Sequence, residues 1–117
     1  MSSQLQSSTS RDLLLWLLRF RRRVRVAGTS MLPHLQPGDE VLFNPRAYHH
    51  HSPQVGDLVI AQHPYQPDLR LVKRITDILD NGHYVIKGDN PTESTDSRTF
   101  GTVTAKHLLG QVTSRFP

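Results

Sequence analysis

The chain has 117 residues, enough for one domain with a hydrophobic core. It contains no cysteine, which excludes disulfides, thiolate metal sites and a cysteine nucleophile. Its net charge of +4 comes from five arginines within the segment Arg19–Arg25, and the rest of the chain holds nine basic and ten acidic residues. Nucleic-acid-binding proteins usually spread basic residues over a face, often with interspersed aromatic residues. The charge distribution therefore disfavours a nucleic acid as partner.

The N-terminal segment is rich in serine, glutamine and threonine, and we expect residues 1–10 to form a disordered tail. A short amphipathic helix is predicted over 11–22, capped by Thr9 or Ser10. Its apolar run is far shorter than the ~20 residues that span a bilayer, and its positive charge follows that run, unlike the charge of a signal peptide. We expect the helix to pack on the domain or on a partner. Peripheral contact with an anionic membrane surface is the alternative.

From residue 23 onward the pattern is that of β-strands, and we assign 23–117 to a single β domain. Alternating or β-branched runs ("RVRVA", "EVLF", "DLVIA", "LRLVKRITDI" and "HYVIK") are separated by glycine, proline and Asp-Asn-Gly turn signals. The segment "TVTAKHLLGQV" is expected to hold a short helical turn and a closing strand. These features predict a mainly β, compact and coiled fold with antiparallel pairing.

One lysine lies on the apolar face of the longest predicted strand. Side chains alternate between the two faces of a strand, so Lys73 shares a face with Leu69, Leu71 and Ile75, while Arg74 points the other way. A lysine is rarely buried without a reason. It could extend its ammonium out of an edge strand or pair with an aspartate. Alternatively, desolvation could lower its pKa from ~10.4 toward neutrality, as a general base requires.

A lone serine stands in the connector "GTSMLPHL", between two predicted strands. A plain connector would favour polar residues and a tight turn, whereas Ser30 has apolar neighbours that suit a hydrophobic groove. The segment is either an ordinary loop with inward apolar side chains or the carrier of a nucleophile. A serine nucleophile needs a base to remove its proton, and a desolvated lysine would supply one. Ser30 and Lys73 are therefore the candidate catalytic pair.

Three segments carry a resemblance to a known family. "SMLPHLQPGDEV" resembles the nucleophile box of type I signal peptidases, "LVKRI" resembles their lysine box, and "GDNPTESTDSRTFGTV" is similar to their third box. The boxes occur in the family's order, from about Val24 to Val112. Within that family, "NPRAY", "VGDLVIAQHPYQPDLRLVKRI" and "GDNPTESTDSR" resemble the short, unanchored proteases that mature nickel-type superoxide dismutase.

The resemblance implies the mostly antiparallel, coiled β fold of signal peptidases and a serine endopeptidase with a Ser–Lys dyad. Its substrate would be the precursor of nickel-type superoxide dismutase, from which it would remove an N-terminal propeptide. Because many members carry a transmembrane anchor that this chain lacks, we expect it to act in the cytoplasm. No cofactor is implied.

The resemblance also implies a role for each residue that matches a box. Ser30 would be the nucleophile, with its backbone N–H as an oxyanion donor, and Lys73 would be the general base. Ser94 would orient the Lys73 amine. Asp96 and Arg98 would pair and hold the third box in shape. The remaining matches shape the backbone: Gly88, Asp89 and Asn90 would form the turn before the third box, and Met31 and Pro33 would shape the loop that presents the nucleophile.

Three positions depart from the family pattern. Gly28 stands where many members have a serine or threonine that supplies a second oxyanion donor. His34 replaces a threonine, and Pro91 replaces an arginine that is common in the anchored enzymes. The run His49–His51 lacks the spacing of metal ligands, so a solvated loop is expected there and no metal site.

Two other functions remain possible on the residues alone. A self-cleaving LexA-type domain shares the Ser–Lys boxes, but it needs a scissile bond that can fold back into its own site. Ala27-Gly28, the only Ala-Gly pair, lies too close to Ser30 for that. A non-enzymatic β module could instead bind a partner through the arginine cluster Arg19–Arg25.

Overall fold

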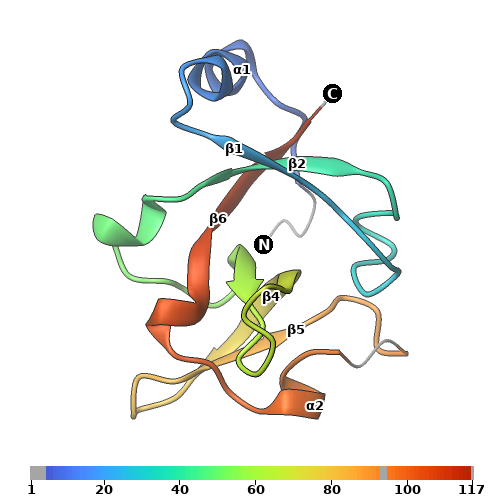
Figure 1. Ribbon diagram of the computed structural model, residues 1–117, viewed down its shortest axis with the longest axis vertical. Helices are drawn as coiled ribbons and strands as arrows, with labels where there is room; N and C mark the ends of the chain where they lie inside the picture. The colour runs from blue at the N-terminus through green and yellow to red at the C-terminus, as the bar shows by residue number, and fades with distance from the viewer. Residues whose placement is uncertain (1–4, 93–94, 117) are drawn as a thin grey trace.

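The β pattern of the sequence becomes one sheet in the computed structural model, which describes residues 5–92 and 95–116 (Figure 1). The strands are β1 (Arg22–Arg25), β2 (Glu40–Asn44), β3 (Leu58–Gln62), β4 (Arg70–Ile78), β5 (Tyr84–Lys87) and β6 (Leu108–Arg115). The helical segments are α1 (Ser10–Leu17), α2 (Ser97–Phe100) and two short 3-10 turns, η1 (Ala47–His49) and η2 (Ala105–His107). The predicted mainly β fold with a short N-terminal helix is confirmed.

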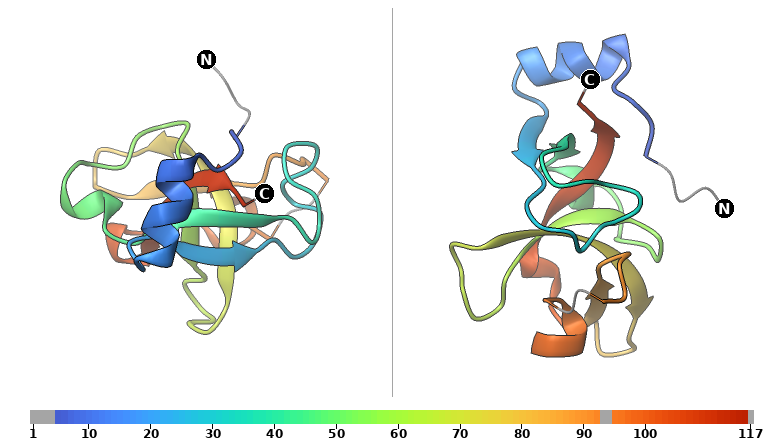
Figure 2. Two further views of the ribbon diagram at one scale, coloured as in Figure 1. Left: turned by 90° about the horizontal axis from the view of Figure 1, so that it is seen from above. Right: turned by 90° about the vertical axis from the view of Figure 1, so that its right-hand side faces the viewer.

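The six strands pair in the order β1-β2-β6-β3-β4-β5, and every pairing is antiparallel. The register shifts at three of the pairings, β2 with β6, β3 with β6, and β4 with β5. Such bulges bend a strand and increase its twist, which explains why the sheet coils instead of lying flat (Figure 2). The coiling brings the loop after β1 close to the segment that follows β5.

The central strands are buried on both faces, and each face packs into a different core. In β3, Leu58 and Ile60 belong to one cluster of buried side chains, whereas the alternating residues Val59 and Ala61 belong to the other. This is the period of two expected of a strand. The first cluster contains Val26, Met31, Leu35, Val41, Phe43, Leu58, Ile60, Val72 and Val112. The second contains Val59, Ala61, Ile75, Tyr84, Ile86, Phe100, Val103 and Leu108.

The N-terminal segment lies along the sheet. The Ser8 N–H donates to the Arg115 carbonyl, and the Arg115 N–H donates to the Gln6 carbonyl, both at 2.8 Å. Residues 6–8, which the composition placed in a disordered tail, are thus held by main-chain hydrogen bonds to the end of β6. The hydroxyl of Thr9 caps α1 by accepting from the Asp12 N–H, as the sequence indicated.

The helix α1 ends at Leu17, earlier than the predicted residue 22, and Arg19 adopts a left-handed backbone with φ 66° in the turn toward β1. The Trp16 ring contacts Phe116 edge-to-face with centroids 4.9 Å apart, and the Arg23 guanidinium stacks on both rings. The helix therefore packs on the β domain. Within the described residues, no helix has the length and apolar character needed to cross a membrane.

Candidate active site

The loop between β1 and β2 is a compact turn that presents Ser30. Its N–H groups at Leu32, His34 and Leu35 donate to carbonyls of Thr29 and Met31 within the same turn. Met31 and Leu35 are completely buried in the first core and anchor the loop, whereas Pro33 is exposed. Ser30 itself is half-buried beside Met31. Two apolar anchors thus hold a polar residue at the edge of the core.

The segment after β5 lies directly against Ser30. A Cβ atom built on Gly88 would lie only 2.5 Å from the Ser30 carbonyl oxygen and 3.0 Å from the Ser30 Cβ. The Asn90 N–H donates to the same carbonyl at 2.8 Å, and the Asn90 side-chain amide donates to the Thr29 carbonyl at 3.0 Å. Only a glycine fits at position 88, because the backbone of the third box approaches the Ser30 backbone this closely.

Lys73 is buried, with 2% of its surface exposed, on strand β4. It lies opposite Val59 of β3, and its neighbour Arg74 lies opposite Lys87 of β5. If the antiparallel register is continued by one residue past the end of β5, Lys73 lies opposite Gly88, which contacts Ser30. The fold therefore brings the segment of the predicted nucleophile and the segment of the predicted base to the same residue.

The surroundings of Lys73 match the predicted apolar face except at one position. Ile75 is fully buried in the second core and Leu71 packs against it. Leu69 precedes β4 and is 38% exposed, so its assignment to this face was wrong. Leu69 belongs to the turn before β4, so the strand begins at Arg70, one residue later than the sequence pattern suggested. The burial of Lys73 also excludes an ammonium that extends into solvent from an edge strand.

Asp96 connects the third box to Gly88. Its fully buried carboxylate accepts hydrogen bonds from the Gly88 N–H, the Arg98 N–H and the Arg98 guanidinium at 2.5–3.0 Å. Burial by itself raises the pKa of this carboxyl, but the hydrogen bonds from Arg98 and Gly88 outweigh it and hold the pKa of Asp96 below its ordinary value. Asp96 thus fixes the glycine that touches Ser30.

We expect Asp96→Asn to destabilise the fold in a pH-dependent manner. A carboxyl with a lowered pKa stabilises the folded state above the pKa of the unfolded chain, and this contribution is lost as the pH falls through the folded value. The expected loss at pH 7 is about 2 kcal/mol, at the low end for a buried pair because the Arg98 side chain is 32% exposed. Urea unfolding at neutral and acidic pH measures it, with the exposed Asp80→Asn as control. Unchanged stability together with abolished activity would indicate a direct chemical role.

Ser94, expected to orient the Lys73 amine, lies outside the described residues. Gly28 has a φ of +75°, a left-handed backbone that disfavours any residue with a Cβ, and it is exposed at the start of the loop. Among the described residues, no group of three or more histidine, aspartate or glutamate side chains is placed to hold a metal ion. The run His49–His51 is exposed.

Comparison with known proteins places this sequence in a family. A family model described as "Signal peptidase, peptidase S26" matches residues 12–78 and 76–116, nearly the whole described chain. The chain belongs to the signal peptidase family. The antiparallel sheet is consistent with the signal peptidase fold, and the predicted membership in this family is confirmed.

Individual relatives come from mitochondria and bacteria. The chain is 29% identical over 108 residues to the human mitochondrial inner membrane protease subunit 1, covering 76% of this chain and 65% of that protein. It is 31% identical to subunit 2 of the mouse protease, covering 76% of this chain and 63% of the relative. A probable signal peptidase I-1 of Synechocystis sp. is 22% identical over 134 residues, covering 78% and 68%. The chain thus spans slightly less than two thirds of the mitochondrial relatives.

This signal peptidase family member has an ionic cluster that the sequence analysis missed. The Arg74 guanidinium donates to both carboxylate oxygens of Asp89 at 3.0 Å and to the Gly56 carbonyl at 3.0 Å. The His34 Nδ1 lies 2.8 Å from the same carboxylate. Asp89, predicted only as part of a turn, therefore joins the loop that carries Ser30 and His34 to β4. Two sequence signals could have revealed this cluster: the alternation that turned Arg74 away from Lys73, and the acidic Asp89, to which only a place in a turn was assigned.

Proposed function

We propose that the chain is a serine endopeptidase in which Ser30 is the nucleophile and Lys73 the general base. One observation carries the proposal: Gly88 contacts Ser30 and, by the register of β4 and β5, lies across from the buried Lys73. Membership in the signal peptidase family supports it. Lys73 is buried between the apolar side chains of Leu71 and Ile75, surroundings of the kind in which a lysine serves as a general base.

In the proposed reaction the neutral Lys73 amine takes the proton of the Ser30 hydroxyl as its oxygen attacks the scissile carbonyl carbon. The Ser30 N–H donates to the oxygen that becomes negatively charged. Collapse of the tetrahedral intermediate breaks the C–N bond, and the Lys73 ammonium returns the proton to the leaving amine. A water molecule, deprotonated by the same amine, then hydrolyses the acyl-enzyme and regenerates the Ser30 hydroxyl. Ser94 would orient the amine during these transfers.

The proposed substrate is the precursor of nickel-type superoxide dismutase, cleaved after its N-terminal propeptide in the cytoplasm. Support comes from the resemblance of "NPRAY" and "GDNPTESTDSR" to the proteases that mature this enzyme. In the structure, "NPRAY" runs from the last residue of β2 into η1, and Gly88 and Asn90 lie against the Ser30 backbone. The mitochondrial relatives are named for the inner membrane, a location that belongs to those proteins.

The direct test is incubation of the chain with the purified precursor, with the released N-terminal peptide identified by mass. We expect one cleavage by the parent chain, none by Ser30→Ala, and full activity from the control Ser52→Ala, which changes an exposed serine. A secretory preprotein serves as second substrate. Cleavage of the preprotein alone would overturn the superoxide dismutase assignment and keep the peptidase. Failure of the parent chain on both substrates and on a library of unstructured peptides would overturn the peptidase itself.

We expect the N-terminal segment to contribute to stability and not to peptide-bond chemistry. A chain that begins at Arg22 loses the contact of Trp16 with Phe116 and the hydrogen bonds that Asp12 accepts from Thr113 and Ser114. Its melting temperature should fall by several degrees, because contacts worth about 2 kcal/mol are removed. Cleavage of a soluble peptide below that temperature should persist. Loss of cleavage by a folded truncated chain would show that residues before β1 build part of the site.

A further inference from the structure

A basic pocket lies beside α1, on elements that the proposed chemistry does not use. It has a volume of about 520 Å3 and lies between the C-terminal end of α1, the start of β1 and the segment that follows β2. Its basic lining consists of Arg11, Arg19, Arg21, Arg22, Arg46 and His50. The described lining residues include no carboxylate, and only Arg21 has an ion-pair partner at the pocket's edge, Asp12 at 3.3 Å. The pocket thus concentrates positive charge that the protein itself leaves largely uncompensated.

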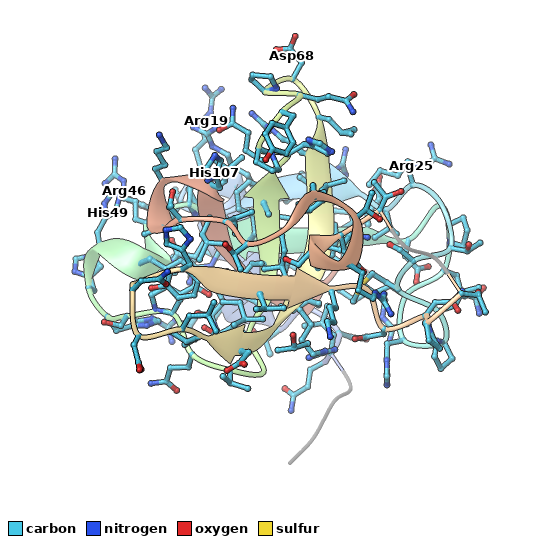
Figure 3. All side chains as sticks on the ribbon, turned by 90° about the horizontal axis from the view of Figure 1, so that it is seen from below. Arg19, Arg25, Arg46, His49, Asp68 and His107 are labelled. Carbon is cyan, nitrogen blue, oxygen red and sulfur yellow. The ribbon has the colours of Figure 1, made fainter. Side chains whose placement is uncertain are left out.

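The arginines come from separate parts of the chain. Arg11 belongs to α1, Arg19 to the turn after it and Arg22 to β1, whereas Arg46 lies before η1. In Figure 3 the labelled Arg19 and Arg46 lie on one side of the molecule, and Arg25 projects on the opposite side. The fold, and not only the sequence cluster, therefore gathers these guanidinium groups.

An apolar stripe lies next to this pocket. Leu14, Leu17 and the C-cap residue Leu18 are 56%, 68% and 56% exposed, and their spacing places them on one face of α1 and its C-terminal end. Phe20 follows the helix, is 54% exposed and also lines the pocket. The helix lies at one end of the molecule, outside the sheet (Figure 2). The opposite face of the helix, with Trp16, is the one that packs on the domain.

We propose that this end of the molecule docks on an anionic phospholipid bilayer. The leucine stripe and Phe20 enter the boundary between headgroups and acyl chains, and the arginines of the pocket bind lipid phosphates. The charge of the pocket is complementary to such a surface. A free phosphate or an acidic peptide would engage the arginines alone and leave the leucine side chains in water, so the combination of both features selects a bilayer. This inference does not depend on the proposed peptidase activity.

The test is co-sedimentation of the full chain with vesicles of phosphatidylcholine, with or without about one third phosphatidylglycerol. We expect binding only to the anionic vesicles. Arg22→Gln with Arg46→Gln should lower the partition coefficient about 25-fold, since each arginine near such a surface contributes about fivefold. Leu14→Gln with Leu17→Gln should lower it at least about tenfold. The control, Arg70→Gln with Lys106→Gln, removes the same charge at exposed positions outside the pocket and should bind like the parent chain.

Several outcomes would overturn the proposal. Absence of binding to the anionic vesicles is one. An equal loss in the control pair would mean that only net charge matters. If vesicle binding were lost in the arginine double variant but not in the leucine double variant, and if pyrophosphate displaced the parent chain from the vesicles, the pocket would be assigned to a soluble anion. All four substituted side chains are exposed, and near-ultraviolet circular dichroism checks that each variant keeps the parent fold.

Discussion

Replacing Lys73 with methionine or arginine is expected to abolish cleavage while the chain remains folded. The side chain is buried between Leu71 and Ile75, so methionine, similar in length and uncharged, fits the same apolar surroundings. Arginine keeps a positive charge but does not release a proton at working pH. Loss of a general base lowers turnover by about 10²- to 10⁴-fold. Initial cleavage rates and thermal melting are measured side by side, with the exposed Lys106→Met as control.

The pH dependence of the parent chain provides a second readout of the same hypothesis. Single-turnover cleavage should rise with pH as the amine of Lys73 loses its proton, since only the neutral amine accepts the proton of Ser30. Lys73→Met should unfold at the same temperature as the parent or at a higher one, because it removes a buried polar group. A Lys73→Arg variant that kept most of the activity would end the dyad hypothesis. The search for a base would then turn to two histidines: His34 in the Ser30 loop, and His63, a buried residue directly after β3.

Gly88→Ala is expected to cause the second large loss of activity. The added methyl carbon would lie 2.5 Å from the Ser30 carbonyl oxygen, so one of the two backbones must move. Because Asp96 holds the Gly88 N–H from the other side, we expect the Ser30 loop to shift. A displacement of about 1 Å in an active site costs about 10²-fold in rate. Cleavage is measured at a temperature below the melting point of each variant.

The matched control for this experiment is Gly110→Ala. Its Cβ would meet the Asn44 carbonyl oxygen at the same 2.5 Å, but in the β2–β6 part of the sheet. We expect a lower melting temperature with normal turnover by the folded protein. If Gly110→Ala lost activity as completely as Gly88→Ala, the effect would reflect general distortion of the sheet. If Gly88→Ala kept the parent rate, the close approach of the third box to Ser30 would have no role in positioning it.

Features governed by local periodicity were predictable from the sequence. The alternation of side chains along β4 placed Lys73 on an apolar face and Arg74 on the other, because a strand repeats every two residues whatever its partners. Thr9 as a helix cap follows from the same kind of local rule. The start of a strand depends on the preceding turn, which explains the error at Leu69.

Features that depend on the pairing of distant segments were not predictable. The contact of Gly88 with Ser30 requires the register of β4 with β5 and the coiling of the whole sheet. The joining of His34 and Arg74 through Asp89 requires three separate segments to meet. The composition of the N-terminal segment likewise gave no indication that Ser8 pairs with Arg115. Their hydrogen bond joins main-chain atoms, which are the same in every residue type and leave no pattern in the sequence.

The presence of two separate cores has a consequence for the relative position of Ser30 and Lys73. The Ser30 loop is anchored by Met31 and Leu35 in one core, while Lys73 lies beside Ile75 of the other. In the proposed dyad, the alignment of Ser30 with Lys73 therefore depends on how these two packing layers fit together on either side of β3. A small change of packing in either layer is expected to alter the cleavage rate before it unfolds the protein. Selection for a higher cleavage rate can then act on aliphatic residues that do not contact the substrate.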